Sequence, residues 1–308
     1  MHKLIGYFFA VVLLVGCSKP AAFQRNSNIV FGTVYNITYQ YDENLQPEIE
    51  DELQKVDGEF SMFNPQSTVA RINSGDSTVE CSAMFLEVYE LAQTVNSQTD
   101  GAFDIHVAPL VNAWGFGFKH DQLPTAQQVD SLLKIRNQMD FSAIAKGYGC
   151  DVVARLLRSH GIENFMVEIG GEVVLSGHND KDQPWHIGVN KPVENAEDGD
   201  LQTVLSITDC AIATSGNYRN FYYKDGKKYA HTIDPRTGYP VQHSLLSATV
   251  LAADCATADA YATSFMVLGV DGAKTVLERH PEFKAYLIYA DESGKMAVWH
   301  SPALDCEL

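Results

Sequence analysis

The sequence predicts an α+β fold built from antiparallel sheets and packed helices. The chain has 308 residues, of which 45% are apolar and 20% charged, so it can bury a large core and is not disordered as a whole. Helical and strand patterns come in separate blocks rather than in regular βαβ alternation. A turn dipeptide between two strand patterns indicates a hairpin, whose strands are antiparallel.

The first half of the chain contains one strand pattern and four helical patterns. Every second residue from Phe31 to Tyr39 is aromatic or β-branched, which predicts a strand. Apolar residues then recur at helical spacing, first at Ile49, Leu53, Val56 and Phe60. Together with a T-x-x-Q capping box and a terminal glycine, this spacing predicts helices at about residues 49–60, 83–96, 125–133 and 143–160.

Strand patterns dominate the second half. They lie at residues 165–169, 173–175, 186–189, 204–208, 218–223 and 245–252. Asp225 and Gly226, between two short aromatic and basic runs, predict a two-residue hairpin turn. Helices at 257–268 and 272–279, and a closing hairpin of 284–289 with 296–299, complete the prediction.

The first 28 residues resemble the leader of a bacterial lipoprotein. A weakly basic start precedes about 12 apolar residues, too few for a membrane span but typical of a signal peptide. The segment ends in Leu-Val-Gly-Cys, which resembles a lipobox, where the chain is cut before a cysteine that then carries lipid. We therefore expect a signal peptide at 1–16, lipidation of Cys17, a tether at 17–28 and one folded domain at 29–308. The protein would be periplasmic and anchored to the bacterial cell membrane; a plain signal peptide with a chance cysteine is the alternative.

The composition excludes several classes of function. The formal net charge is −17, from 22 basic and 39 acidic residues, and such a surface repels nucleic acids and anionic lipid headgroups. The cysteines other than Cys17 show no C-x-x-C spacing, so no zinc site is indicated, while disulfides and buried free thiols both stay open. The sequence lacks the glycine-rich phosphate loops of the Walker and Rossmann types and the motifs of serine hydrolases and zincins.

Two predicted helices carry candidate chemistry. Lys146 lies in the first turn of the helix at 143–160, which Asp140 or Ser142 would cap; a cation there opposes the helix dipole unless an anion binds beside it. Asp259 and Thr263 are four residues apart on one helix face, so their oxygens can reach one hard cation.

A third segment, from His231 to Pro240, combines a tight turn with reactive side chains. This segment contains Asp-Pro-Arg-Thr-Gly-Tyr-Pro, which is rich in residues that favour turns. One interpretation is therefore a tight loop with no catalytic role. His231 and Arg236 beside the turn favour the other interpretation, a catalytic loop.

Six motifs together make the sequence resemble the ApbE flavin transferases, which are lipid-anchored, Mg²⁺-dependent enzymes. The resemblance runs from about Phe31 to Gly269, and the lipobox agrees with it. The motifs are T-x-G-A-F-D from Thr99, A-K-G-Y from Ala145, E-I-G-G-E from Glu168, T-S-G-N-Y-R from Thr214, H-x-I-D-P-x-T-G-x-P from His231 and A-D-A-x-A-T from Ala258.

The resemblance implies two related T-fold-like halves with an FAD site between them. It also implies a Mg²⁺ ion held by Asp259, Thr263 and the backbone carbonyl of Ala143, an oxygen-only set that suits this ion. Phe31 and Phe63 depart from the family pattern, which often has Met and Tyr there, and Phe63 lacks the tyrosine hydroxyl. Contacts to FAD are implied for Phe31, Phe63, Ala102, Phe103, Asp104, Asp140, Lys146, His231 and Ile233.

The implied activity is transfer of the FMN half of FAD to a Ser or Thr hydroxyl of a target protein, with release of AMP. The metal on Asp259 would neutralise charge as AMP departs, while the hydroxyl attacks the FMN phosphorus in line. His231 is the candidate general base, or it orients the acceptor, or it makes only a structural hydrogen bond. Phosphate contacts are expected from Lys146, which could instead contact Asp140, and from Arg219 and Arg236.

The acceptor would carry a Ser/Thr-Gly-Ala-Thr-like motif, as a subunit of a membrane redox complex or as a small flavin-carrying domain. Three alternatives stay open at this point. One is a periplasmic FAD pyrophosphatase that gives FMN and AMP. The others are a non-catalytic flavin-binding lipoprotein, which would not need the pair of Asp259 and Thr263, and a structural envelope lipoprotein.

Overall fold

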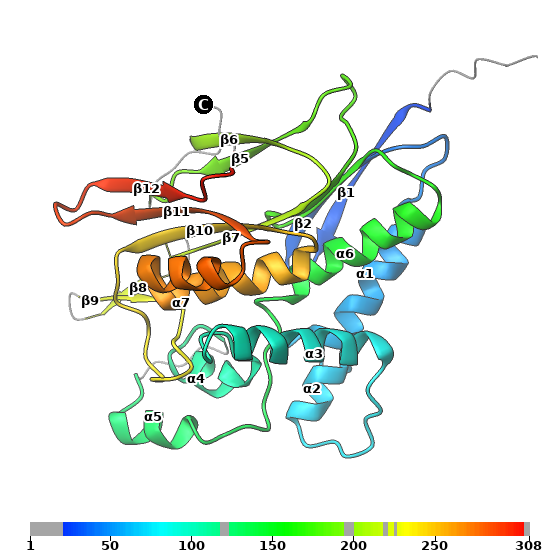
Figure 1. The fold of residues 1–308 in the computed structure, drawn as a ribbon. Coiled ribbons are helices and arrows are strands. Elements are labelled where there is room, and N and C mark those ends of the chain that lie inside the picture. Colours follow the sequence, from blue (N-terminus) through cyan, green and yellow to red (C-terminus); the bar gives the residue numbers. More distant parts are fainter. Residues whose placement is uncertain (1–20, 118–122, 194–199, 218–220, 225–226, 305–308) are drawn as a thin grey trace, which may run out of the picture.

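The computed structural model describes residues 21–117, 123–193, 200–217, 221–224 and 227–304, and one large sheet covered by helices dominates it (Figure 1). The strands are β1 (Phe23–Val30), β2 (Thr33–Gln40), β3 (Phe165–Ile169), β4 (Glu172–Ser176), β5 (Trp185–Asn190), β6 (Leu201–Ile207), β7 (Ala211–Gly216), β8 (Phe221–Lys224), β9 (Lys227–Ala230), β10 (Leu245–Ala252), β11 (Lys284–Ala290) and β12 (Met296–His300). The helices are α1 (Gln46–Phe60), α2 (Thr68–Asn73), α3 (Ala83–Gln98), the 3₁₀ turn η1 (Ile105–Val107), α4 (Ala108–Ala113), α5 (Ala126–Leu132), α6 (Ala145–Ser159) and α7 (Cys255–Arg279).

The large sheet has eight strands in the order β1-β2-β3-β4-β7-β10-β11-β12, and every neighbouring pair is antiparallel. The pairs β5-β6 and β8-β9 form two small separate sheets. At the centre of the large sheet, β4 pairs with β7 and so joins four N-terminal strands to four C-terminal strands. The predicted α+β fold with antiparallel sheets is therefore confirmed.

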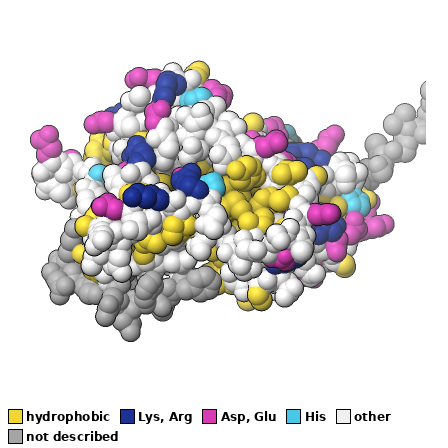
Figure 2. All heavy atoms as spheres, turned by 90° about the horizontal axis from the view of Figure 1, so that it is seen from below, with side chains coloured by type: hydrophobic (Ala, Val, Ile, Leu, Met, Phe, Trp, Pro, Cys, Tyr) yellow, Lys and Arg dark blue, Asp and Glu magenta, His cyan; other side chains and the backbone are white. Residues whose placement is uncertain are grey.

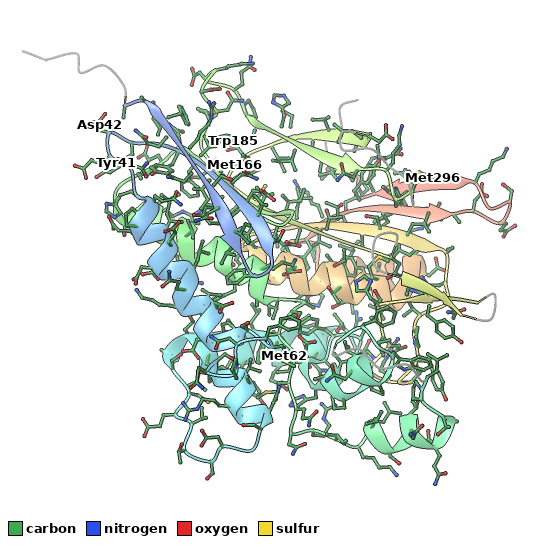
Figure 3. All side chains as sticks on the ribbon, turned by 180° about the vertical axis from the view of Figure 1, so that it is seen from behind. Tyr41, Asp42, Met62, Met166, Trp185 and Met296 are labelled. Atoms are coloured by element: carbon green, nitrogen blue, oxygen red, sulfur yellow. The ribbon has the colours of Figure 1, made fainter. Side chains whose placement is uncertain are left out.

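Helices cover one face of the large sheet, and the β5-β6 hairpin covers the other (Figure 1). On the helical face, Tyr35, Leu53 and Phe165 belong to one apolar cluster that joins α1 and α6 to β2 and β3. On the opposite face, Met166 of β3 and Trp185 of β5 belong to a separate cluster (Figure 3). A further layer, made of α2 to α5, lies beyond α6 and α7 (Figure 1). The first turns of α6 and α7 are thereby held between the sheet and this outer layer.

The N-terminal hairpin differs from the prediction. β1 begins at Phe23 and pairs with β2 along its whole length, so the boundary expected between tether and domain at residues 28 and 29 falls inside a strand. β1 is an edge strand with mostly exposed, polar side chains, and it therefore lacks the alternation that marks a half-buried strand. Phe31 and Gly32 form the turn, with φ of +52° and +73°, rather than the start of a strand.

The predicted signal peptide and Cys17 lie outside the described residues. Within the described part of the chain, no helix has both the length and the apolar character needed to cross a membrane.

Most predicted elements are confirmed within a few residues, including the capping box of α5, which Thr125 and Gln128 form. The helices predicted at 257–268 and 272–279 are both part of α7, with Gly269 at φ +72° between them. The prediction missed α2, α4 and β7, which are only six residues long and too short for a clear period. The turn at Asp225 and Gly226 and residues 218–220 of a predicted strand lie outside the described residues, but β8 and β9 on either side of the turn do pair.

The first turns of α6 and α7 approach each other very closely. A Cβ atom on Gly147 of α6 would lie 2.3 Å from the carbonyl oxygen of Cys255 in α7, so this contact requires glycine. Asp151 of α6 is buried and accepts hydrogen bonds of 2.8 Å from the backbone N–H groups of both Cys255 and Ala256. These N–H groups have no acceptor within their own helix, so a side chain of α6 completes the start of α7.

We expect Gly147→Ala to lower the free energy of unfolding by about 1–3 kcal/mol, because the added methyl group forces α6 and α7 apart. Urea unfolding followed by circular dichroism measures the change. The matched control is Gly58→Ala in α1, where a Cβ atom meets nothing within 4 Å and alanine improves helix propensity. A Gly147→Ala chain as stable as the wild type would contradict the close contact.

Candidate functional site

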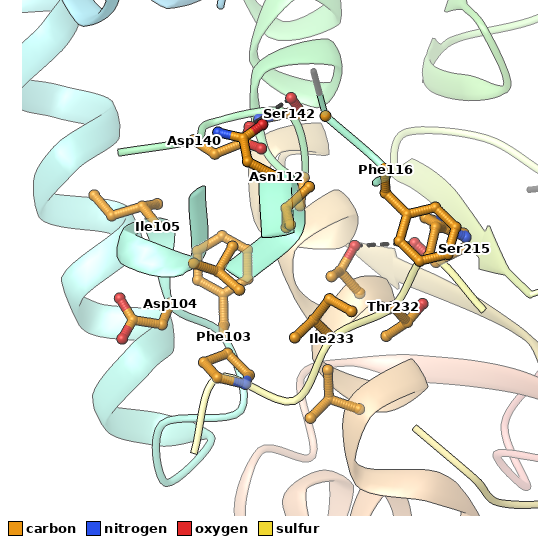
Figure 4. Close-up of a pocket in the computed structure, with 18 of the residues that line it drawn as sticks. Phe103, Asp104, Ile105, Asn112, Phe116, Asp140, Ser142, Ser215, Thr232 and Ile233 are labelled. Carbon is orange, nitrogen blue, oxygen red and sulfur yellow. Dashed lines mark hydrogen bonds between the residues drawn. The ribbon is translucent and has the colours of Figure 1, made fainter. Parts of the chain in front are cut away.

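Two neighbouring cavities lie between the helical layers. The cavity that is lined by most of the candidate residues, called the main cavity below, has a volume of about 260 Å³, and the larger adjoining cavity has one of about 570 Å³. They share Met62, Phe63 and Ser142, and together they reach the size of a typical small-molecule site. Figure 4 shows that the main cavity takes its lining from both the first and the second half of the chain.

Most residues singled out from the sequence line these cavities. Phe31 and Lys146 line the adjoining cavity, and Cys17 lies outside the described residues. Asp259 lines neither cavity and is buried just behind them. The main cavity is lined by Phe63, Ala102, Phe103, Asp104, Asp140, Ala143, His231, Ile233 and Thr263.

Two hydroxyl groups, from β7 and α7, meet at one wall of the main cavity. Oγ1 of Thr263 lies 3.1 Å from Oγ of Ser215 at the end of β7, and both residues line the cavity (Figure 4). Asp259, one turn earlier in α7, is 3% exposed, and its Oδ2 accepts a hydrogen bond of 3.1 Å from the N–H of Gly147. Ala143 lines the cavity from the loop before α6. Carboxylate, hydroxyl and carbonyl oxygens are the ligands that Mg²⁺ prefers.

Lys146 forms an ion pair that the sequence analysis did not predict. Its partner among the described residues is Glu172 of β4 rather than Asp140, and Nζ lies 2.6 Å from Oε1 of Glu172. Burial would lower the pKa of Lys146, but the negative charges of Asp259 and Glu172 outweigh burial and raise it. The side chain therefore stays positively charged at the edge of the adjoining cavity.

The two carboxyl groups beside Lys146 are unusually basic. Burial raises the pKa of Glu172 to about 8, because the attraction of Lys146 offsets only part of that effect and Asp259 adds repulsion. Burial also raises the pKa of Asp259, again against the attraction of Lys146. Oε2 of Glu172 is buried without a hydrogen-bond partner in the described structure. The positive charge of Lys146 thus offsets only part of the cost of burying these two carboxyl groups in their charged form.

Asp140 organises the loop before α6 but does not cap the helix as predicted. Its Oδ1 accepts hydrogen bonds from N–H and Oγ of Ser142, at 2.8 Å and 2.5 Å (Figure 4). The N-cap residue is Ile144, whose side chain caps nothing. The carboxylate of Asp259 supplies an acceptor instead, because the N–H of Gly147 that it binds belongs to the first turn of α6.

Asp104 lines the main cavity with its carboxylate held by two basic side chains. Oδ2 lies 2.6 Å from Nη1 of Arg136, and Oδ1 lies 3.0 Å from Nδ1 of His106. Burial would raise the pKa of Asp104, but the hydrogen bonds from His106 and Arg136 outweigh burial and lower it. Arg136 and His106 therefore hold the Asp104 carboxylate in place and favour its charged form.

Seen from below, the outer face shows Lys and Arg side chains grouped beside a hydrophobic patch (Figure 2).

His231 and Ile233 line the main cavity from the loop after β9. The imidazole of His231 lies edge-on to the ring of Phe116, with 6.4 Å between ring centroids. Ile233 forms an isolated β-bridge with Pro240, which closes the predicted tight turn. The loop therefore presents a half-buried imidazole to the cavity from a fixed backbone.

Three residues, Arg236, Glu172 and Ser215, differ from the prediction, and a fourth, Arg219, is not tested. Arg236 is held by Asp234 through hydrogen bonds of 2.9 Å from Nε and Nη2, outside the cavity lining, and Arg219 lies outside the described residues. Glu172 and Ser215 were not predicted as site residues, although both lie inside the motifs E-I-G-G-E and T-S-G-N-Y-R. Their position inside these motifs was the sequence signal that could have identified both residues. Their contacts are made to other elements of the fold, so no local sequence pattern predicts them.

Glu172 makes the stability of the metal-free chain depend on pH. The pKa of Glu172 rises from 4.5 to about 8 on folding. Glu172 therefore stabilises the folded state fully below pH 4.5, and this stabilisation is lost as the pH rises through about 8. We expect the free energy of unfolding to fall from pH 5 to pH 8, and to fall less in Glu172→Gln, which cannot ionise. Urea unfolding at both pH values measures this, with the exposed Glu163→Gln as control. Equal pH dependence in Glu172→Gln and wild type would contradict the raised pKa.

Comparison with known proteins agrees with this arrangement of motifs. Residues 31–287 match the ApbE family. An FAD:protein FMN transferase from Vibrio cholerae is 37% identical and aligns over 93% of each chain. One of the same name from Haemophilus influenzae is 35% identical over 96% of this chain and 95% of its own.

Solved structures show the same similarity. The flavin transferase ApbE from Vibrio cholerae superposes with a TM-score of 0.82 at 36% identity, over 92% of this chain and 98% of that one. The apo form of the flavinyl transferase ApbE from Pseudomonas stutzeri has a TM-score of 0.82 at 27% identity, over 92% and 96% of the two chains. From the family match and from relatives of this identity and coverage, we conclude that the chain belongs to the ApbE family.

Proposed function

We propose that this chain is an FAD:protein FMN transferase, which moves the FMN half of FAD to a Ser or Thr hydroxyl of an acceptor protein and releases AMP. Relatives of that name, 34% to 37% identical over most of their length, support this. The observation that carries the proposal is the pair of hydroxyl groups of Thr263 and Ser215 in a cavity lined by the family's motifs, with the buried Asp259 one turn earlier in α7.

The FAD site would lie between two related T-fold-like halves. Each half consists of two antiparallel strands, a helical part and two further antiparallel strands: β1-β2 and β3-β4 in the first, β7-β10 and β11-β12 in the second. The main cavity is lined by Phe103 and Asp140 from the first half and by Ser215, His231 and Thr263 from the second. This shared lining supports a site at the junction of the halves.

A magnesium ion fits the oxygen set behind the main cavity. Burial of Asp259 disfavours its charged form, and a bound cation would offset that cost. Among the described residues, no group of three or more His, Cys, Asp or Glu side chains is placed to hold a metal. As the resemblance to the family implies, the ion would be held by Asp259, Thr263 and the carbonyl of Ala143, with phosphate and water oxygens completing its shell, as is typical of Mg²⁺.

The chain's own residues would bind FAD, orient it and move one proton. Phe63, Phe103 and Ile233 offer apolar surface to the flavin and adenine rings. Asp259, Thr263 and the carbonyl of Ala143 would hold Mg²⁺, which would supply positive charge to offset the negative charge of the FAD phosphates. Lys146 adds positive charge at the adjoining cavity, and its ion pair with Glu172 fixes its position. An imidazole nitrogen of His231 takes the proton from the acceptor hydroxyl as that oxygen attacks the FMN phosphorus.

The lipobox supports a periplasmic location, with Cys17 carrying the lipid that anchors the protein to the cell membrane. The acceptor would then be a protein of the same compartment, such as a subunit of a membrane redox complex, with a Ser/Thr-Gly-Ala-Thr-like motif. β1 begins at Phe23, so only the five residues 18–22 separate Cys17 from the first strand.

We expect Asp259→Asn to abolish FMN transfer at every Mg²⁺ concentration, because the neutral amide cannot hold the ion. The measurement is flavin fluorescence of the acceptor band on a denaturing gel, with AMP release followed in parallel. Asp271→Asn, an exposed position on the same helix, is the matched control and keeps its activity. A transfer rate unchanged in Asp259→Asn at saturating FAD would contradict the metal assignment; AMP and free FMN without a labelled acceptor would favour the pyrophosphatase.

We expect His231→Gln to lower kcat by about 10²–10⁴-fold with little change in KM for FAD, because a general base acts in the transition state and not in binding. Steady-state kinetics of AMP release in the presence of acceptor measures both constants. An increase in KM alone would show that His231 only shapes the turn.

A further inference from the structure

Two buried cysteines meet where α6 and α7 are closest. Cys150 lies one turn after Lys146 in α6, and Cys255 is the first residue of α7, one turn before Asp259. Both side chains are fully buried and belong to the same apolar cluster. Both are free thiols in the structure, and each thiol affects the pKa of the other.

The sheet below holds both thiols at one place. Sγ of Cys150 donates to the carbonyl oxygen of Glu172 at 3.2 Å, and Sγ of Cys255 donates to that of Ile212 at 3.8 Å. Glu172 and Ile212 lie side by side where β4 pairs with β7, because Val173 is the register partner of Ile212. The two cysteines therefore point at the same junction of the sheet from two facing helices.

The backbones of the two helices are also in close contact beside this pair. A disulfide forms only between closely spaced backbones whose side chains point toward each other. The contact of Gly147 with the backbone of Cys255 brings α6 and α7 together one turn before Cys150. The other described cysteines are elsewhere: Cys81 is exposed, and Cys210 packs on the opposite face of the sheet.

We propose that Cys150 and Cys255 form a disulfide when the chain folds in an oxidising compartment, and that this bond ties the N-terminal part of the sheet to its C-terminal part. The sequence left disulfides and free thiols equally open, and the packing of α6 on α7 selects this pair. The inference rests on the proposed export of the chain and not on its proposed activity.

The oxidant would be a small or protein disulfide, such as glutathione disulfide. The thiolate of one cysteine attacks it and releases one glutathione thiol; the second cysteine then attacks the mixed disulfide and releases the other, so the two cysteine protons end on the two glutathiones. Burial raises the pKa of both thiols in the folded chain. The exchange must therefore happen before α6 and α7 close over the pair, and the finished bond is shielded from reductants.

Peptide mapping tests the bond. The full chain with its own leader is produced in a bacterium with an oxidising periplasm, alkylated in denaturant without reductant, and digested with trypsin. Cys150 then lies in the peptide of residues 147–155 and Cys255 in that of residues 237–274, and each peptide holds a single cysteine. We expect the two peptides to be joined, lighter than their sum by two hydrogen atoms, and separable by dithiothreitol.

A refolding experiment separates the disulfide from export. The same full chain is unfolded, reduced and refolded in a mixture of glutathione and its disulfide, and then mapped in the same way. Two alkylated cysteines after refolding would overturn the proposal whatever the compartment. Joined peptides after refolding, together with free thiols in the cell-derived chain, would overturn the export on which the proposal rests.

Stability supplies a second measurement. The chain refolded with dithiothreitol should have a Tm lower by on the order of 5–10 °C than the same unliganded chain refolded with the glutathione mixture, because the bond closes a loop of more than a hundred residues. The control Cys210→Ser should show the same difference between its two refolded forms, and Cys150→Ser should show none. Equal Tm values for the two wild-type forms would contradict the bond.

Discussion

The structure depends on the contact between the first turns of α6 and α7, in which each helix supplies the carboxylate that the other needs. Asp259 of α7 accepts a hydrogen bond from Gly147 in the first turn of α6, and Asp151 of α6 accepts from Cys255 and Ala256 at the start of α7. Helix N-termini carry unsatisfied N–H groups and partial positive charge, so both carboxylates are stabilised by this exchange. Neither first turn can shift without breaking bonds at the other, and only glycine at position 147 allows the backbones to come so close.

The electrostatics of the site follow from that contact. It places Asp259 beside Lys146, whose other partner, Glu172, is the first residue of the strand below. Burial raises the pKa of both carboxyl groups because one lysine cannot compensate for both. Buried charges of this kind contribute less to stability than to a defined geometry, and they leave the site favourable for an added cation.

The same contact determines how the cavity is assembled. α6 follows the first strands of the sheet and α7 precedes the last, so the main cavity receives the Ala102–Ile105 segment from one side and Ser215 and Thr263 from the other. Thr263 lies one turn after Asp259, which contacts α6. A covalent bond between Cys150 and Cys255 would fix the spacing of α6 and α7, since both residues lie within one turn of the charged cluster.

Sequence patterns predicted most of the helices and strands and many of the residues that line the site. Helical periodicity predicted α1 and α3, the capping box predicted α5, and the motifs named the residues that line the main cavity, because each depends on neighbours along the chain. The polar edge strand β1 left no such pattern. Only the tertiary structure decided that Lys146 pairs with Glu172 and that Asp259 completes α6, because these partners are brought together by the packing of α6 and α7 on the sheet. Spacing along a chain identifies which side chains share a helix face, but it carries no information about which distant side chain will satisfy a buried charge.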